Sequence, residues 1–144
     1  MPKNESSAMK YLRGIAKNAK GDFAVVAPEN LRKAVQKLKD NGMYRLICIT
    51  GVDTGTAVDA IYTLSFDGTM FNLKVPLNHK KPEVESISDL LPAASLYELE
   101  LMEMLGVKVL NHPMPEKRMF LPEDWKQGPP LRKAFIQKLA GGQK

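Results

Sequence analysis

Three glutamates, Glu98, Glu100 and Glu103, lie close together in one apolar stretch of the chain. Two carboxylates can act as a general acid and a general base when their side chains face each other. On a helix, residues two positions apart point in roughly opposite directions, and only residues three or four apart share a face. Glu98 and Glu100 therefore do not predict an acid/base pair, and a solvated or partner-facing acidic patch is the favoured interpretation.

Two other motifs resemble catalytic sites without completing one. His112 in Asn-His-Pro is a candidate general base, but no serine or cysteine nucleophile stands beside it. A turn-stabilising or interface role is favoured for this histidine. The glycine-rich stretch 51–55 lacks the lysine of a P-loop and precedes a predicted strand, not a helix. Asp53 within it is expected to cap a turn or to bind a neighbouring chain.

Few side chains could hold a metal. Cys48 is the one cysteine, and His79 and His112 are the two histidines. An iron–sulfur cluster needs about four ligands, and a zinc site is built mostly from cysteine and histidine. We therefore expect no cofactor in this chain.

The net charge of +5 leaves two kinds of partner open. Basic residues gather on the predicted helix 28–41 and in the last third of the chain. A basic surface suits nucleic acid as well as an acidic protein partner. A nucleic-acid-binding module would bind with a strong salt dependence, because released counterions drive such contacts. Aromatic residues make up only 7% and form no stacking motif on a strand, which disfavours an RNA-binding sheet.

Helices must position these side chains, and the spacing of apolar residues predicts them at 8–19, 28–41 and 93–105. Pro28 suits the first position of the second helix, and Gly106 ends the third. The helix 93–105 carries the acidic residues and is apolar on more than one side. We expect it to pack on two surfaces.

Alternating apolar residues predict the strands. The hairpin 57–77 is the clearest, because Asp67-Gly68 is a strong two-residue turn between two alternating segments. Apolar residues on both faces predict a buried strand at 44–50, and a shorter strand is predicted at 23–26. The glycine-rich stretch 51–55 is expected to be a loop.

The last third of the chain differs in character. Five prolines interrupt residues 111–135 and are expected to prevent a regular helix or sheet. The same segment carries Phe120, Leu121, Trp125 and Leu131, and a disordered tail is seldom so apolar. An extended arm that lies along another protein explains both features. The alternative is that the segment wraps around its own domain.

These expectations define one fold. We predict an α+β domain over residues 1–110, with an N-terminal helix and two layers. Its sheet is mostly antiparallel with about four strands, and its helices cover one face. An extended, proline-rich docking arm follows over residues 111–144.

Several motifs together resemble the 30-kilodalton subunit family of respiratory complex I, also known as the C-type subunit. Residues 96–107 resemble the family's signature helix, whose core is Glu-Arg-Glu, two residues, an acid, two apolar residues and Gly-Ile. Three further motifs of the family follow in the same order. His-Pro is matched by His112-Pro113, Leu-Pro-Asp-Asp-Trp by residues 120–125, and Gly-His-Pro-Leu-Arg-Lys by residues 128–133. Upstream matches in the same order occur at 50–53, 74–77 and 86–94.

The resemblance implies a non-catalytic subunit in the peripheral arm of a membrane-bound oxidoreductase. It would dock onto the large catalytic subunit and a neighbouring iron–sulfur subunit, on the cytoplasmic face of the cell membrane, with only indirect membrane contact and no nucleic acid. Iron–sulfur clusters, and a nickel–iron centre in some branches, would lie in those partners. The motifs place the partner interface at Asp53, Glu98, Glu100, His112, Pro122, Trp125, Arg132 and Lys133.

Departures from the family pattern bear on the branch. Leu99 replaces the arginine of Glu-Arg-Glu, Pro129 replaces a histidine, and one extra residue follows His112 before the Leu-Pro motif. These differences favour the branch found in membrane-bound hydrogenases and related ferredoxin-linked complexes. The C-type subunit of an NADH:quinone oxidoreductase is the alternative.

Overall fold

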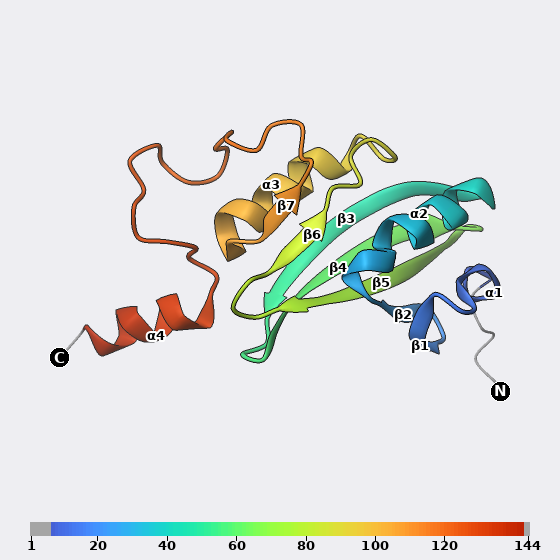
Figure 1. Cartoon of the computed structure of the whole chain (residues 1–144), viewed down its shortest axis with the longest axis horizontal. Coiled ribbons are helices and arrows are strands. Elements are labelled where there is room, and N and C mark those ends of the chain that lie inside the picture. The colour runs from blue at the N-terminus through green and yellow to red at the C-terminus, as the bar shows by residue number, and fades with distance from the viewer. Residues whose placement is uncertain (1–6, 143–144) are drawn as a thin grey trace.

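The computed structural model describes residues 7–142. Figure 1 shows a twisted sheet with helices lying across it and the C-terminal helix apart from them. No helix in this part of the chain is long and apolar enough to cross a bilayer. The elements in chain order are α1 (Met9–Leu12), β1 (Ala16–Lys20), β2 (Phe23–Val26), a 3-10 turn (Pro28–Asn30), α2 (Leu31–Asp40), β3 (Met43–Asp53), β4 (Ala57–Phe66), β5 (Thr69–Asn78), β6 (Glu83–Glu85), α3 (Ala94–Leu105), β7 (Lys108–Leu110) and α4 (Lys133–Gly141).

The main sheet has the strand order β1-β2-β5-β4-β3. All neighbours are antiparallel except β2 and β5, which are parallel. A separate small sheet pairs β6 with β7 in parallel. The predicted two-layer, mostly antiparallel α+β fold is confirmed, with five strands in the main sheet where about four were expected.

The hairpin of β4 and β5 confirms the prediction for 57–77. Asp67 and Gly68 have φ values of 48° and 73°, as a two-residue turn with positive φ at both positions requires. Pairing continues without a bulge from Phe66 opposite Thr69 to Ala57 opposite Asn78. The hairpin therefore fixes the register of the sheet's centre.

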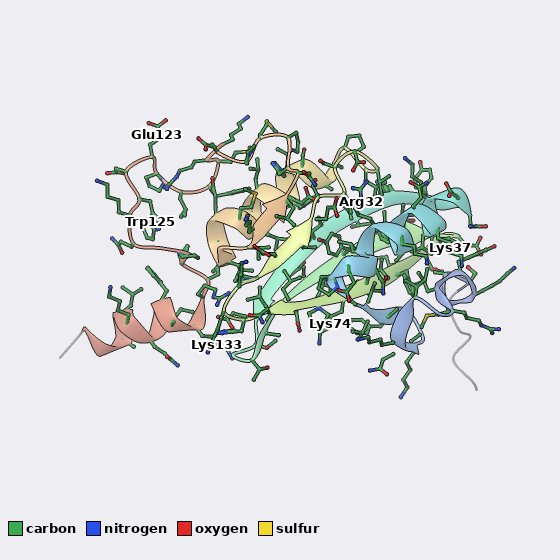
Figure 2. All side chains as sticks on the ribbon, in the orientation of Figure 1. Arg32, Lys37, Lys74, Glu123, Trp125 and Lys133 are labelled. Carbon is green, nitrogen blue, oxygen red and sulfur yellow. The ribbon has the colours of Figure 1, made fainter. Side chains whose placement is uncertain are left out.

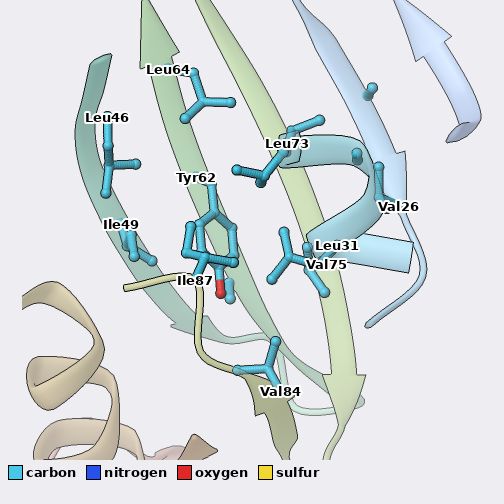
Figure 3. Packing of buried hydrophobic residues seen from close by; sticks show 14 of the residues in the cluster. Val26, Leu31, Leu46, Ile49, Tyr62, Leu64, Leu73, Val75, Val84 and Ile87 are labelled. Atoms are coloured by element: carbon cyan, nitrogen blue, oxygen red, sulfur yellow. The ribbon is translucent and has the colours of Figure 1, made fainter. Parts of the chain in front are cut away.

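The core lies between the hairpin's inner face and the helices. Figure 3 shows inward-pointing side chains of neighbouring strands with Leu31 of α2 and Ile87 beside them: Leu46, Ile49, Tyr62, Leu64, Leu73 and Val75. All are buried. The apolar face predicted for α2 is also buried, at Leu31, Ala34, Val35 and Leu38.

The predicted loop 51–55 is wrong at its start, because β3 continues to Asp53. Gly51 lies in this strand opposite Ala60, on the face that α3 covers. A Cβ atom at Gly51 would come within 2.6 Å of Leu101 Cδ2 and closer still to Leu105 Cδ1. The glycine thus allows α3 to lie close to the strand, which is a packing role and not a phosphate-binding one.

The predicted helix 8–19 is also wrong over most of its length. Only Met9–Leu12 is helical, and Gly14 with φ of 81° turns the chain into β1. Gly21, with φ of 67°, then lies in the turn between β1 and β2. The apolar residues of this segment are nevertheless buried, as their spacing predicted: Met9, Leu12 and Ile15. Pairing with β2 outweighed the weak helical propensity of this segment.

The C-terminal third is irregular up to Arg132 and then forms α4. The prediction that no regular helix occurs there is wrong for Lys133–Gly141. The five prolines all precede this helix, so the reason for excluding it does not apply there. Among the described residues after Leu110, only His112 is buried. We call residues 111–142 the arm.

Candidate functional site

The arm is attached to the domain at three polar anchors, and Figure 2 shows its path. Trp125 and Glu123 lie on the loop that is remote from the sheet, and Lys133 lies where the arm returns to it. The first anchor is Glu103 near the C-terminal end of α3, the second is the end of α3 itself, and the third is Asp53 at the end of β3.

Glu103 accepts hydrogen bonds from three successive backbone amides of the arm. Its carboxylate binds the N–H groups of Met119, Phe120 and Leu121, the last two at 2.7 and 3.1 Å. Hydrogen bonds from backbone amides to a charged carboxylate are among the stronger ones in proteins. The sequence contains a signal for this contact. An acid in the last turn of a helix opposes the helix dipole, and this turn has no basic residue.

The end of α3 receives the arm through backbone contacts. Gly106 is in the left-handed conformation with φ of 67° and closes the helix. The Leu131 N–H donates to the Met104 carbonyl at 2.9 Å, which satisfies one of the carbonyls exposed at a helix end. Pro129 lies so close that a Cβ atom at Gly106 would be 2.7 Å from its Cγ. Gly106 is thus needed both to end the helix and to admit the arm.

Asp53 binds the arm at the start of α4. Its side chain is 1% exposed and accepts hydrogen bonds from the N–H groups of Gly55 and Lys133, at 2.9 and 3.0 Å. His79 Nε2 lies 2.8 Å from Oδ1, and Arg132 Nε lies 3.3 Å from Oδ2. The structure therefore brings together three predicted site residues, Asp53, Arg132 and Lys133, and adds His79.

These contacts set the charge state of Asp53. Burial raises the pKa of the carboxyl group, but the amides of Lys133 and Gly55, the His79 ring and the Arg132 charge together outweigh it. The pKa is lowered to about 2. Because the folded pKa is below that of an unfolded aspartate, the stabilisation is fully present above about pH 5 and is lost as pH falls toward 2.

We expect Asp53→Asn to flatten the acid limb of the stability curve. The amide keeps the shape but loses the charge, so the free energy of unfolding at pH 7 should fall by about 1–3 kcal/mol. It should then change less between pH 5 and 2 than in the unmodified chain. Some slope should remain, because Arg32 lowers the pKa of Asp89 to about 2 as well.

Urea titrations across this pH range measure both effects. Asp124→Asn is the matched control, because Asp124 is exposed on the arm. An Asp53→Asn chain whose stability declines as steeply in acid as that of the unmodified chain would contradict the assignment.

Glu98 is fully buried, so it does not belong to a solvated or partner-facing acidic patch. Its carboxylate accepts the Ser86 hydroxyl at 2.7 Å and the Ile87 N–H at 2.8 Å. Burial raises the pKa of Glu98, although these two hydrogen bonds and nearby His112 lower it. The side chain thus fixes the segment before α3 onto the helix from the inside.

His112 stabilises the turn that starts the arm, as one of the two favoured roles predicted. Nδ1 accepts the Met114 N–H at 3.0 Å, and Nε2 lies 2.9 Å from the Ser95 carbonyl. A proton on Nε2 satisfies both contacts. His112 Nε2 is 3.8 Å from Glu98, so the structure brings these two predicted residues together as well.

The remaining predicted residues lie apart from these clusters. Glu100 is half-buried on another side of α3, which confirms that it does not converge with Glu98. Pro122 is exposed, and its carbonyl accepts the N–H of Trp125 at 3.0 Å. Trp125 donates its indole N–H to the Gly128 carbonyl at 2.7 Å, and its ring centre is 5.9 Å from that of Phe135. Their use as a partner interface stays a prediction.

Metal binding has no visible basis in the described part of the chain. Within residues 7–142, no three His, Cys, Asp or Glu side chains gather where they could hold an ion. The expectation that this chain carries no cofactor remains a prediction.

A sequence model of the family described as the respiratory-chain NADH dehydrogenase 30-kilodalton subunit matches residues 24–140. The chain belongs to this family. The resemblance carried by the sequence motifs is thereby confirmed. As a member of the 30-kilodalton subunit family, the chain is a subunit of the complex I-like NADH-quinone oxidoreductase type.

Individual relatives support this assignment. The C-type subunit of NADH-quinone oxidoreductase from Moorella thermoacetica is 36% identical over 124 residues, which cover 83% of this chain and 82% of the relative. The C/D-type subunit of the same enzyme from Phocaeicola vulgatus is 33% identical over 119 residues, covering 79% of this chain and 22% of the relative. A chain of the membrane-bound sulfane sulfur reductase, an archaeal respiratory membrane complex, has the same fold. Its TM-score is 0.76 at 19% identity, with 94% of this chain and 88% of that chain covered.

Proposed function

We propose that this 30-kilodalton-type subunit is a non-catalytic docking subunit in the peripheral arm of a membrane-bound oxidoreductase. It binds the large catalytic subunit and a neighbouring iron–sulfur subunit on the cytoplasmic face of the membrane. It carries no cofactor itself, and the iron–sulfur clusters lie in its partners.

The exposed apolar side chains of the arm carry this proposal. Five large apolar residues of the arm are between 45% and 57% exposed: Met119, Phe120, Leu131, Ile136 and Leu139. The three anchors hold the arm in place through polar contacts and leave these side chains outward. Exposed apolar side chains that the chain itself does not cover are available for a partner to bury.

The Phocaeicola relative supports the choice of partner. Its name joins the C and D types in one chain, and this chain matches 22% of it. Sharing one chain gives the C-type and D-type regions of that relative equal copy numbers. We propose that the large catalytic subunit is the corresponding partner here.

The rival nucleic-acid function loses part of its basis. Arg32 of the basic helix forms two 2.7 Å hydrogen bonds with Asp89 and donates to the Ser86 carbonyl. Lys39 donates to the Leu90 carbonyl at 2.8 Å. These contacts leave α2 with less free positive charge than its sequence suggested. A filter-binding titration at two salt concentrations tests the rival directly.

The branch of the family is a second proposal. Leu99, which replaces the family's arginine, is fully buried in α3. This departure and Pro129 favour a membrane-bound hydrogenase or similar ferredoxin-linked complex, whose partner would hold a nickel–iron centre. The identity to the C-type subunit of Moorella favours the alternative, an NADH:quinone oxidoreductase.

Native purification with a tag on this chain tests the function. We expect the large catalytic subunit and an iron–sulfur subunit to co-purify in equal molar amounts, with no iron, nickel or flavin on the isolated chain. Whether the purified complex accepts electrons from NADH or from reduced ferredoxin distinguishes the two branches. A chain that purifies alone from membranes, or that binds stoichiometric metal by itself, would contradict the proposal.

A further inference from the structure

A groove of about 420 Å³ runs between the end of α3 and the start of α4. Its apolar walls include Leu105, Pro129 and Phe135. Three cationic side chains also line it, those of Lys80, Arg132 and Lys138, and no acidic residue does. The groove therefore combines apolar walls with positive charge.

Arg132 in this groove lacks one hydrogen-bond partner. Its Nε lies 3.3 Å from Asp53, and its Nη2 donates to the His79 carbonyl at 2.6 Å. Its Nη1 is shielded from solvent and has no acceptor among the described residues. A shielded guanidinium nitrogen without an acceptor is costly, and such groups in native proteins call for an explanation.

The two lysines beside Arg132 add positive charge without compensation. Neither Lys80 nor Lys138 forms an ion pair with another residue within 7–142. Lys133 does not share this role. Its N–H binds Asp53, and its Nζ donates to the Thr54 carbonyl at 3.2 Å. Asp53 faces Arg132 from within the chain, but the described residues supply no anion for Lys80 and Lys138, so the groove keeps excess positive charge.

We propose that this groove binds an aspartate or glutamate side chain of the partner subunit, with Arg132, Lys80 and Lys138 around the carboxylate. The inference rests on the docking function proposed above and names the chemistry of the contact. A planar guanidinium matches a carboxylate, and a partner packed over the apolar walls would exclude water and strengthen the pair. Residues that flank the acid would pack on Phe135 and Leu105. A flat membrane surface fits less well, because the cations converge in a groove.

The first test uses the isolated, full-length chain. Side-chain ¹⁵N NMR signals of Arg132 and backbone signals of Phe135 and Lys138 are followed while propionate, a carboxylate with a short apolar tail, is added. We expect saturable shifts of these signals. The apparent affinity for propionate should fall at least about tenfold in the Lys80→Glu/Lys138→Glu variant, which we call the groove variant. The reason is that the charge around the acid is reversed.

A matched control and two other probes make the test specific. Lys20→Glu/Lys37→Glu changes the net charge equally at exposed positions outside the groove, and should leave the shifts intact. Saturation by phosphate but not by propionate would overturn the carboxylate assignment. Binding to phosphatidylglycerol vesicles that is lost in the groove variant, without a propionate response, would overturn it in favour of a membrane. The absence of any saturable shift would also overturn it.

The second test uses the assembled complex. The groove variant should co-purify with its partners at least about tenfold less than the control variant, if the acid is supplied by a partner. Co-purification of the unmodified chain tests the docking function alone, so the two proposals can fail separately. Propionate binding together with unchanged assembly of the groove variant would contradict the partner assignment.

Discussion

A chain that ends after Met114 should fold and fail to assemble. Of the described residues after Leu110, only His112 is buried, and this truncation retains it with its contacts to Ser95 and Met114. We expect the loss of the three anchors to lower the free energy of unfolding by about 1–3 kcal/mol. Binding to the large subunit should weaken by roughly 100-fold or more, because the exposed apolar residues of the arm are removed.

Circular dichroism, urea unfolding and co-purification measure these outcomes. Ile136→Ser/Leu139→Ser tests the same surface with all three anchors present and should weaken assembly without changing stability. Tyr44→Ser/Met70→Ser is the matched control, because these side chains are 81% and 62% exposed on the sheet, outside the arm. A truncated chain that unfolds would show that the arm belongs to its own core. One that folds and assembles normally would refute the docking arm.

Glu98→Ala should be the most destabilising single change in the site. It leaves the Ser86 hydroxyl and the Ile87 N–H without their acceptor and opens a cavity beneath α3. The Tyr62 hydroxyl, also fully buried, already has no partner among the described residues. We expect a loss of about 3–5 kcal/mol in the free energy of unfolding, measured by urea titration.

Two comparisons isolate the role of this carboxylate. Glu100→Ala, two residues along the same helix, should cost only about 0.5 kcal/mol, because Glu100 is half-buried and outside the cluster. Glu98→Gln keeps the volume and should lose less than Glu98→Ala. Because burial raises the pKa of Glu98, the unmodified chain loses stability as pH rises through that pKa, and the glutamine variant does not. The difference in the free energy of unfolding between the unmodified chain and Glu98→Gln should therefore become smaller as pH rises. Equal losses of stability in Glu98→Ala and Glu100→Ala would contradict the role of the buried cluster.

Local patterns predicted the elements whose signals were consistent over many residues. The hairpin 57–77 and the helix 93–105 formed as expected, because period and turn or cap residues agreed in each. The motifs from 50 to 133 also identified the family. The segment 8–19 failed because its apolar spacing fits burial in a short helix and turn as well as in a longer helix. The loop predicted at residues 51–53 was wrong because Gly51 is part of a strand that packs against Leu101 and Leu105, about 50 residues further along the chain.

The sequence by itself determined the α+β class, the central hairpin, the signature helix and the residue types available for docking. Only the tertiary structure decided how those residues are used. Asp53 and Lys133 are 80 positions apart, and their contact depends on where α3 and the arm lie, which no local period encodes. Likewise, Glu98 and Glu100 differ in role because packing buries one carboxylate and leaves the other near solvent. Burial and long-range contacts arise only when the layers pack together. They decide which charged residues form the three anchors, the buried cluster around Glu98 and the groove.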